Sequence, residues 1–374
     1  MLDKTNVKVL DKVVVRFSGD SGDGMQLAGN IFTNVSAGVG NEVSTFPDYP
    51  AEVRAPQGSL SGVSGFQVSV GRGVHTPGDR CDVLLAMNPA ALKQNVRFLK
   101  SGGIIIVDSD SFGEADLRKA LFATNDPYTE LGIDPAQVLE VPVTTMTRAA
   151  LADSGMDNKS ILKCRNIFAL GVVCWLFDRP IEAACHYISK KFAKKPAIAK
   201  ANCAVVQAGY DFGHNTHASM STYRIETEDP RPGVYTDING NTATAWGLIM
   251  ASEKSGRPLF LGSYPITPAT DILHELAKRK DLGVKACQME DEIAGVCSAI
   301  GASFAGNLAV TSTSGPGLAL KSEGIGLAVI AELPLVVIDV QRGGPSTGLP
   351  TKTEQTDLMQ ALYGRNGESP IVVL

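Results

Sequence analysis

The feature that most restricts how this sequence can fold is the alternation of short apolar runs with segments long enough to form helices. We expect buried strands at residues 13–17, 83–86, 104–107, 259–261, 308–311 and 335–340. Helices are expected at residues 161–177, 181–192, 197–212, 239–252, 270–280, 290–305 and 318–331. Strands that alternate with helices build parallel sheets, so the sequence predicts an α/β fold.

A polar segment divides the sequence into two parts. Residues 214–234 lack apolar periodicity and end in the Pro-containing stretch 229–232, which marks a boundary. We therefore expect a first domain at residues 1–213, a linker at 214–234 and a second domain at 235–374. Residues 369–374 resemble the beginning of a buried strand, so we expect the second domain to be incomplete at its C-terminus.

Composition argues against several classes of protein. The formal net charge of −5 gives no reason to expect nucleic acid or an anionic membrane as a partner. No apolar run approaches the roughly 20 residues that cross a bilayer, and the N-terminal segment MLDKTNVKVLDK lacks the apolar core of a secretory signal, so we expect a cytoplasmic protein. The cysteines form no Cys-x-x-Cys pair and no cluster with zinc or iron–sulfur spacing, so no metal site is expected in this chain.

A glycine-rich segment, SGDSGDGMQLAG at residues 18–29, follows the first expected strand and precedes a helix-compatible stretch. Three of its glycines would let backbone N–H groups approach an anion near the positive end of that helix: Gly19, Gly22 and Gly24. The segment lacks the Gly-Lys-Ser/Thr of a P-loop, and Asp20 and Asp23 would face a bound pyrophosphate. A structural turn explains the segment as well as an anion site does.

A second candidate anion contact is Arg54, the single arginine in the Gly-, Ser- and Pro-containing stretch at residues 49–71. An arginine in such surroundings suits an anionic ligand. A solvated surface charge is the alternative interpretation.

Four further segments of the second half follow expected strands or begin a helix. They are SYPITPATDI at 263–272, MEDEIAGVCSAIGASFAG at 289–306, TSTSGPGL at 311–318 and VQRGGPSTGLPTKTEQTDL at 340–358. Open α/β sheets bind ligands at the carboxyl ends of their strands. Arg342 directly follows a strand, and its guanidinium fork suits a carboxylate. The alternative is an arginine that caps a neighbouring carbonyl group.

Three consecutive acids, Glu290, Asp291 and Glu292, stand at the start of an expected helix. The helix dipole favours negative charge there, which explains an exposed acidic cluster without any function. The helix continues with small residues, however, so another backbone can approach it and bury one acid. Residues 290 and 292 would point roughly 200° apart, so only one of them can face a cleft.

These segments together resemble a known family. The Tyr-Pro-Ile-Thr-Pro turn, the acid-Glu-x-Ala-Gly helix, the TSTSGPG loop and the RGGPSTGLPT segment resemble the thiamine diphosphate pyrimidine domain of the 2-oxoacid:ferredoxin oxidoreductases. The segments at 18–29 and 49–71 resemble the gamma domain of that family, which contributes to coenzyme A binding. The resemblance implies a gamma-type α/β domain followed by a pyrimidine domain with a parallel α/β fold.

The resemblance also implies a role for individual residues. Glu292 matches the glutamate that hydrogen-bonds the pyrimidine ring, and Thr267 and Arg342 match residues that hold the 2-oxoacid carboxylate. The other implied contacts are Tyr264, Pro265 and Ile266 for the thiamine cofactor, and Gly19, Gly22, Gly24 and Arg54 for coenzyme A.

The motifs that are missing imply partners. The family's cysteine clusters and its Gly-Asp-Gly…Asn motif for Mg²⁺ and the diphosphate are absent, which implies a separate beta subunit carrying that site and a 4Fe–4S cluster. An (alpha–beta)₂ assembly that reduces ferredoxin is implied. The expected reaction is decarboxylation of a 2-oxoacid to acyl-CoA and CO₂, or the reverse reductive carboxylation. The RGGPSTGLPT segment favours 2-oxoglutarate over pyruvate or branched-chain acids.

Two other classes of function compete with this interpretation. A transketolase-like or non-oxidative decarboxylase subunit would share the pyrimidine helix but would need no gamma-like domain at residues 13–71. A catalytically inactive assembly subunit would not need Thr267, Glu292 and Arg342 together.

Overall fold

The chain folds into two compact units, Met1–Tyr235 and Thr236–Leu374, which are described separately. The computed structural model describes residues 6–50, 55–216, 221–227, 233–236, 238–345, 354–366 and 371–374. Within these ranges, no helix has both the length and the apolar character needed to cross a membrane.

The first unit contains a six-stranded sheet in the order β3-β4-β2-β5-β6-β7. Its strands are β2 (Lys12–Asp20), β3 (Glu42–Asp48), β4 (Val63–Gly71), β5 (Cys81–Ala86), β6 (Leu99–Asp108) and β7 (Val138–Val141). Strands β2, β5 and β6 are parallel as predicted, and β7, which was not expected from the sequence, also runs parallel to β6. Strand β4 runs antiparallel to both β2 and β3. The sheet is therefore mixed. Strands β3 and β4 are consecutive in the sequence and pair antiparallel, with no α-helix described between them.

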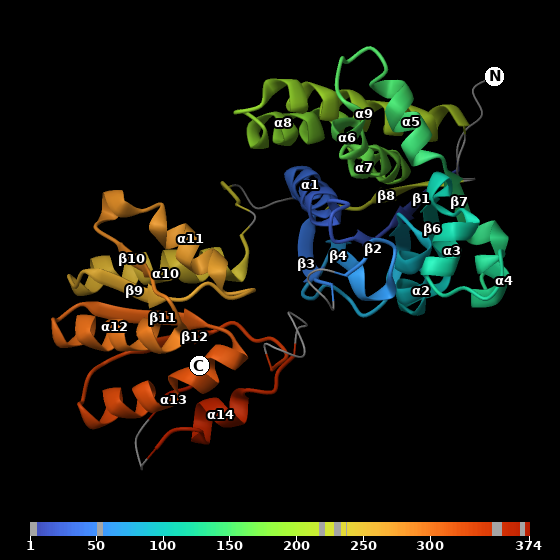
Figure 1. Ribbon diagram of the computed structural model, residues 1–374. Helices are drawn as coiled ribbons and strands as arrows, with labels where there is room; N and C mark the ends of the chain where they lie inside the picture. The colour runs from blue at the N-terminus through green and yellow to red at the C-terminus, as the bar shows by residue number, and fades with distance from the viewer. Residues whose placement is uncertain are drawn as a thin grey trace. The chain divides into compact units, whose positions relative to one another are not determined.

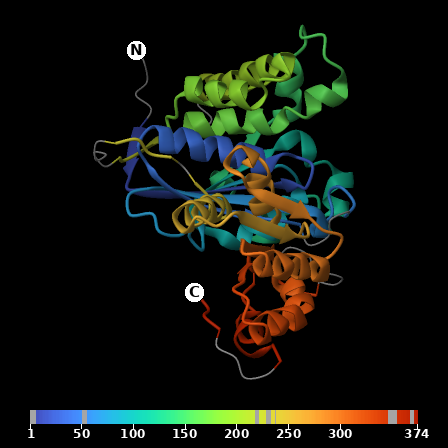
Figure 2. The same ribbon diagram turned by 90° about the vertical axis from the view of Figure 1, so that its left-hand side faces the viewer.

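Helices cover both faces of this sheet (Figures 1 and 2). They are α1 (Met25–Gly38), α2 (Pro89–Asn95), α3 (Glu114–Lys119), α4 (Pro127–Leu131), α5 (Val143–Ala150), α6 (Asn158–Leu162), α7 (Arg165–Leu176), α8 (Ile181–Lys191) and α9 (Pro196–Thr216). One core joins α1, α7, α8 and α9 to one face, and a second joins α2 and α3 to the other. Because α1 follows β2 and α2 follows the adjacent β5, the chain leaves neighbouring strands toward opposite faces. The carboxyl ends of β2 and β5 thus form a topological switch point.

The prediction of a linker at residues 214–234 is wrong for part of that range. Ser221–Ile225 forms strand β8, which pairs in parallel with β1 (Asn6–Leu10). Ile225 is only 4% exposed and belongs to the core of the first unit. Sequence periodicity missed this strand because its partner lies at the other end of the unit. Residues 217–220 and 228–232 lie outside the described part of the chain.

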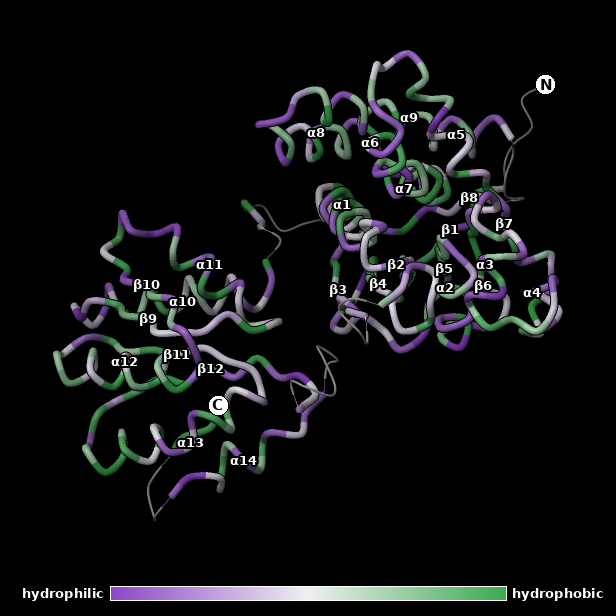
Figure 3. The backbone as a smooth tube through the Cα atoms, in the orientation of Figure 1, coloured by the Kyte–Doolittle hydropathy of each residue, from purple (hydrophilic) through white to green (hydrophobic). Residues whose placement is uncertain are grey.

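The second unit has a parallel four-stranded sheet in the order β10-β9-β11-β12. Its elements are α10 (Gly240–Ser255), β9 (Leu259–Ser263), α11 (Thr270–Ala277), β10 (Lys285–Gln288), α12 (Glu292–Phe304), β11 (Leu308–Thr313), α13 (Gly315–Ile330), β12 (Val336–Asp339) and α14 (Leu358–Tyr363). Much of α12 is hydrophobic in Figure 3, in agreement with its small apolar residues. The buried strand expected at 369–374 is not present at 371–374, where the chain is exposed and irregular.

In the first unit, helices α7 and α9 pack through two glycines. A Cβ atom at Gly171 would lie 2.2 Å from the carbonyl oxygen of Val206, and one at Gly209 would lie 2.1 Å from that of Phe168. Such contacts are far inside van der Waals distance and involve backbone atoms, which cannot rotate away. The two backbones therefore meet only because neither residue has a side chain.

Gly171→Ala should push α7 and α9 apart and lower the free energy of unfolding by about 1–3 kcal/mol, the usual cost of overpacking a core. Thermal and urea unfolding of the variant would measure this loss. The matched control is Gly38→Ala at the end of α1, where an added Cβ meets nothing within 4 Å. This control should leave stability unchanged or raise it by up to about 1 kcal/mol. Equal stability of the two variants would contradict the close packing.

Candidate functional site

Four polar segments of the second unit gather at one edge of its sheet. The turn at 264–269 follows β9, Glu292 follows β10, the loop leading into α13 follows β11, and Arg342 follows β12. Since all four strands are parallel, their carboxyl ends lie at the same edge. The hydroxyl of Ser263 joins two of these segments, because it lies 2.8 Å from the carbonyl oxygen and 2.9 Å from the hydroxyl oxygen of Ser312.

The structure separates the three acids at the start of α12. Asp291 is the N-cap, and its carboxylate accepts a hydrogen bond of 2.7 Å from the backbone N–H of Ala294. Glu290 and Asp291 are exposed, whereas Glu292 is 8% exposed. The Glu292 side chain lies against Gly317, where a Cβ atom would stand 2.8 Å from Cγ and 3.3 Å from Oε1 of the glutamate. Only Glu292 is therefore directed into the interior of this edge.

Arg342 lies close to the other two predicted catalytic residues. Its side chain is 7% exposed, and Nη1 donates a hydrogen bond of 3.0 Å to the carbonyl oxygen of Thr267. Burial lowers the pKa of Arg342, and attraction to Glu292 opposes this change. The hydrogen bond to Thr267 agrees with the alternative in which Arg342 caps a neighbouring carbonyl group. The attraction to Glu292 indicates that Arg342, Thr267 and Glu292 lie near one another.

The predicted pocket residues differ in exposure. Tyr264 is 38% exposed, Ile266 is 9% exposed, and Pro265 is intermediate. This turn leads into α11, and the backbone N–H of Thr270 bonds to the carbonyl of Ile266 at 3.0 Å. The turn thus presents one aromatic ring outward and anchors its apolar residue in the core.

Lys321 on α13 belongs to the same group and was missed by sequence reasoning. Its side chain is fully buried, and Nζ donates to the carbonyl oxygen of Glu292 at 3.0 Å and to the hydroxyl of Thr311 at 2.9 Å. The available signal was a single lysine in a stretch of mostly apolar and small residues, GPGLALKSEGIGLAVI, whose one other charged residue is Glu323. A lysine on a helix usually extends to solvent, so this signal is weak.

The glycine-rich loop lies at the switch point of the first unit. Asp20 accepts hydrogen bonds from the backbone N–H of Gly58 at 2.8 Å and from the side chain of Asn88 at 3.0 Å. Asp23 accepts from the N–H of Asp20 at 2.9 Å and pairs with Arg165 at 3.1 Å. Both carboxylates are thus bonded to groups of the first unit, most of them outside the loop, which weakens the objection that they would repel an anion.

The three loop glycines have different surroundings. Gly24 has a φ of +74°, which a glycine adopts without strain. A Cβ at Gly19 would lie 2.9 Å from the carboxylate of Asp23, whereas one at Gly22 would meet nothing within 4 Å. Gly22 is therefore the glycine whose backbone is open to a ligand. The predicted partner Arg54 lies outside the described residues.

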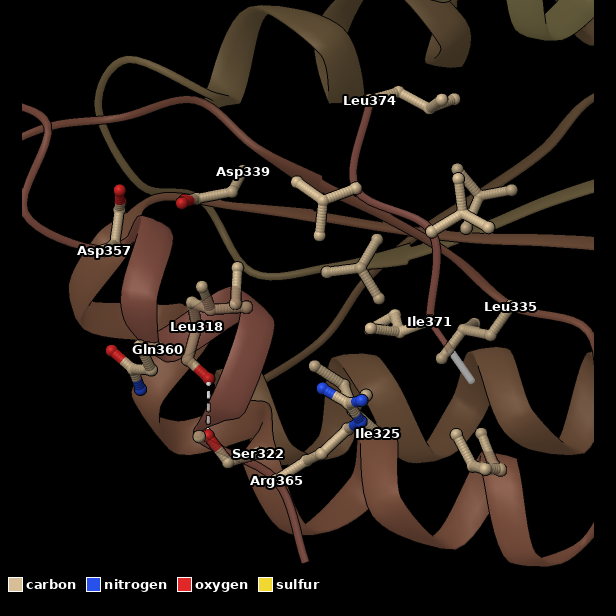
Figure 4. A pocket seen from close by; sticks show the side chains of 18 of the residues that line it. Leu318, Ser322, Ile325, Leu335, Asp339, Asp357, Gln360, Arg365, Ile371 and Leu374 are labelled. Carbon is tan, nitrogen blue, oxygen red and sulfur yellow. Dashed lines mark hydrogen bonds between the residues drawn. The ribbon is translucent and has the colours of Figure 1, made fainter. Parts of the chain in front are cut away.

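A cavity of about 780 Å³ lies between α13, β12 and α14 (Figure 4). Its lining includes Leu318 and Gln341 but not Glu292, Thr267 or Arg342. Figure 4 shows the carboxyl groups of Asp339 and Asp357 directed toward each other at one end. Asp357 is 4% exposed and accepts a hydrogen bond of 2.5 Å from the side chain of Gln341. Asp357 belongs to the same segment, 340–358, as Arg342, but the acid pair is not part of the Glu292 group.

Comparisons with known proteins identify the family of this chain. Residues 14–212 match the family model described as pyruvate ferredoxin/flavodoxin oxidoreductase. Residues 252–374 match the model described as pyruvate flavodoxin/ferredoxin oxidoreductase, thiamine diP-bdg. The chain belongs to the pyruvate ferredoxin/flavodoxin oxidoreductase family.

Individual relatives cover nearly the whole chain. It is 53% identical over 366 residues to 2-oxoglutarate oxidoreductase subunit KorA of Mycobacterium tuberculosis, covering 98% of this chain and 56% of that protein. The structure of 2-oxoglutarate:ferredoxin oxidoreductase from Magnetococcus marinus, with 2-oxoglutarate, coenzyme A and succinyl-CoA bound, matches with a TM-score of 0.74 and 31% identity. That match covers 96% of this chain and 57% of the other. This chain thus spans little more than half the length of these relatives.

The acid pair in the cavity predicts a pH dependence of stability. Burial raises the pKa of Asp339 to about 8, and the neighbouring Asp357 adds to the rise. The pKa of this carboxyl is higher in the folded protein than in the unfolded chain. Its contribution to the free energy of unfolding is therefore fully present below the pKa of the unfolded chain and is lost as the pH rises toward about 8. Asp339→Asn should therefore raise the melting temperature at about pH 8 and change little at about pH 4. The control is Glu253→Gln at an exposed position of α10, which should not show this difference. A difference in melting temperature between wild type and Asp339→Asn that stays the same from about pH 4 to about pH 8 would refute the raised pKa of Asp339.

Proposed function

We propose that this chain is the alpha subunit, with a fused gamma domain, of a 2-oxoglutarate:ferredoxin oxidoreductase. The proposed reaction is the oxidative decarboxylation of 2-oxoglutarate to its acyl-CoA and CO₂ with reduction of ferredoxin, or its reversal as reductive carboxylation. The observation that carries the proposal is the buried Glu292, which lies with Arg342 and Thr267 at the carboxyl edge of a parallel sheet. The names of the relatives support the choice of 2-oxoglutarate.

The residues at this edge fit the pyrimidine ring of thiamine diphosphate. Glu292 is 8% exposed as a residue, and among the described residues none donates a hydrogen bond to its carboxyl group, which leaves that group able to accept or donate a bond to a ligand. Gly317 leaves the space beside this carboxyl free of a side chain. Tyr264, Pro265 and Ile266 would line the cofactor site on the neighbouring turn.

The roles proposed for the chain's own residues follow from this fit. Glu292 would hold a proton against the ring nitrogen, while Arg342 and Thr267 would orient the 2-oxoacid carboxylate. The bound cofactor supplies the electron sink for loss of CO₂. The protein contributes position and charge, since fixed charges in a water-poor site act more strongly than in water.

Coenzyme A and the electron acceptor would use other parts of the assembly. We assign coenzyme A to the loop of Gly19, Gly22 and Gly24, supported by its place at a topological switch point, with Arg54 as a further contact. Mg²⁺, the diphosphate and a 4Fe–4S cluster are assigned to a beta subunit, and ferredoxin to the complex as a whole. The proposed assembly is an (alpha–beta)₂ complex in the cytoplasm.

The first test concerns dependence on the partner. The purified chain alone should not reduce an electron-accepting dye with any 2-oxoacid and coenzyme A. With its beta subunit the complex should do so, preferring 2-oxoglutarate to pyruvate and branched-chain 2-oxoacids. Turnover by the isolated chain would contradict the proposal. A complex that decarboxylates without coenzyme A or an electron acceptor would favour the non-oxidative decarboxylase instead.

The second test concerns the three acids at the start of α12. Glu292→Gln keeps the size of the side chain but cannot supply the acid, so kcat of the complex should fall by about 10²-fold or more. Glu290→Gln is the matched exposed control and should stay within a few-fold of wild type. Asp291→Asn preserves a capping side chain and should behave similarly. Melting temperatures would be measured alongside. Equal activities of the three variants would remove Glu292 from the mechanism.

A further inference from the structure

Lys321 is a buried cation at the centre of the second unit. Its side chain has no exposed surface, and its ammonium group lies between α12 and α13. Gly295 makes this position possible, since a Cβ atom there would stand 3.2 Å from Nζ. Removing an ammonium ion from water costs several kcal/mol. A buried ammonium group among the small and apolar residues of α12 and α13 therefore needs an explanation other than the filling of space.

Both hydrogen bonds of this lysine lead to the Glu292 group. One goes to the backbone carbonyl of Glu292 itself, at the first residue of α12, and the other goes to Thr311 on β11. The charged and titratable groups that face the ammonium come from α12: Glu292, Asp291 and Cys297. Lys321 therefore links the start of α12 to the central strand and places a positive charge beside the Glu292 carboxyl.

We propose that Lys321 is the positioning residue for Glu292: its ammonium group anchors the backbone of residue 292 and thereby fixes where the Glu292 side chain lies. This inference rests on the function proposed above, because it assigns to Glu292 the contact with the pyrimidine ring. Lys321 does not contact the reacting atoms itself. It fixes where the glutamate lies relative to the cofactor site.

A purely structural role makes different predictions. A buried lysine that only stabilises the fold can be replaced by an apolar side chain of similar length with little loss, or even a gain, in stability. Such a replacement would leave the order of the first turn of α12 and the pH profile unchanged. A positioning role requires both to change while the fold persists.

The pH dependence follows from the same burial. Desolvation lowers the pKa of Lys321 from 10.5 to about 8, with Glu292 the largest opposing influence. The ammonium is thus present at neutral pH and is lost as the pH rises above about 8. In wild type, affinity for thiamine diphosphate and kcat should both decline through this range.

The experiment uses the complete complex with its beta subunit and three variants. Lys321→Met removes the charge and both bonds, Thr311→Val removes one acceptor, and Lys254→Met is the control at an exposed position of α10. Three quantities are measured: hydrogen–deuterium exchange of the peptide that contains residues 292–295, the dissociation constant of thiamine diphosphate, and kcat with 2-oxoglutarate, the last two between about pH 6 and pH 9.5.

Lys321→Met should exchange faster at 292–295, lose about tenfold or more in kcat near neutral pH, and lose the alkaline decline. Thr311→Val should change in the same direction by a smaller factor and move the decline to lower pH, since it removes a bond to the charged lysine. Lys254→Met should match wild type in all three measurements.

The proposal is overturned if Lys321→Met matches wild type in exchange and kcat and keeps the alkaline decline. Should that variant fail to fold, an unchanged Thr311→Val and a wild type without the alkaline decline overturn it equally. The proposed function fails separately, because a wild-type complex that neither binds thiamine diphosphate nor consumes a 2-oxoacid would refute it. The exchange measurement still tests the link between Lys321 and residue 292 in that case.

Discussion

Parallel pairing of the four strands in the second unit is the constraint on which the candidate site depends. Ser263 pairs with Gln288 and Thr313 pairs with Asp339, so the strands end at nearly the same level. Residues far apart in the sequence are thereby delivered to one edge. An antiparallel sheet would send alternate loops to the opposite edge and would separate Glu292 from Arg342.

Burial of several ionisable groups at this edge is the second constraint. Glu292, Arg342 and Lys321 are each less than a tenth exposed. Isolated buried charges are costly, and opposite charges placed together offset part of that cost. The two cations and the acid therefore depend on one another. Close approach of the helices is possible because Gly295 and Gly317 have no side chains in the way.

The apolar runs allowed the main strands and helices to be predicted from the sequence, and the limits of that prediction have physical causes. Strand β10 was missed because KACQ has too little apolar character to stand out. Strand β8 was missed because pairing with β1 is a long-range property. The position of Glu292 came from the family resemblance, since helix geometry alone distinguishes residues 290 and 292 without selecting either. Lys321 could not be found, because its burial depends on the contact between α12 and α13.

The pairing of β1 with β8 has a consequence for how the first unit is built into larger proteins. These two strands are the first and last of the unit, and they lie side by side in the same direction. Because the pair is parallel, the polypeptide enters the unit at the Asn6 end of the pair and leaves it at the Ile225 end, and the six-stranded sheet and its helices lie between these two strands in the sequence. Such a unit can be joined to another domain, or separated from it by a change in the gene, without any rearrangement of its core. Its architecture thus favours exchange between fused and independent forms during evolution.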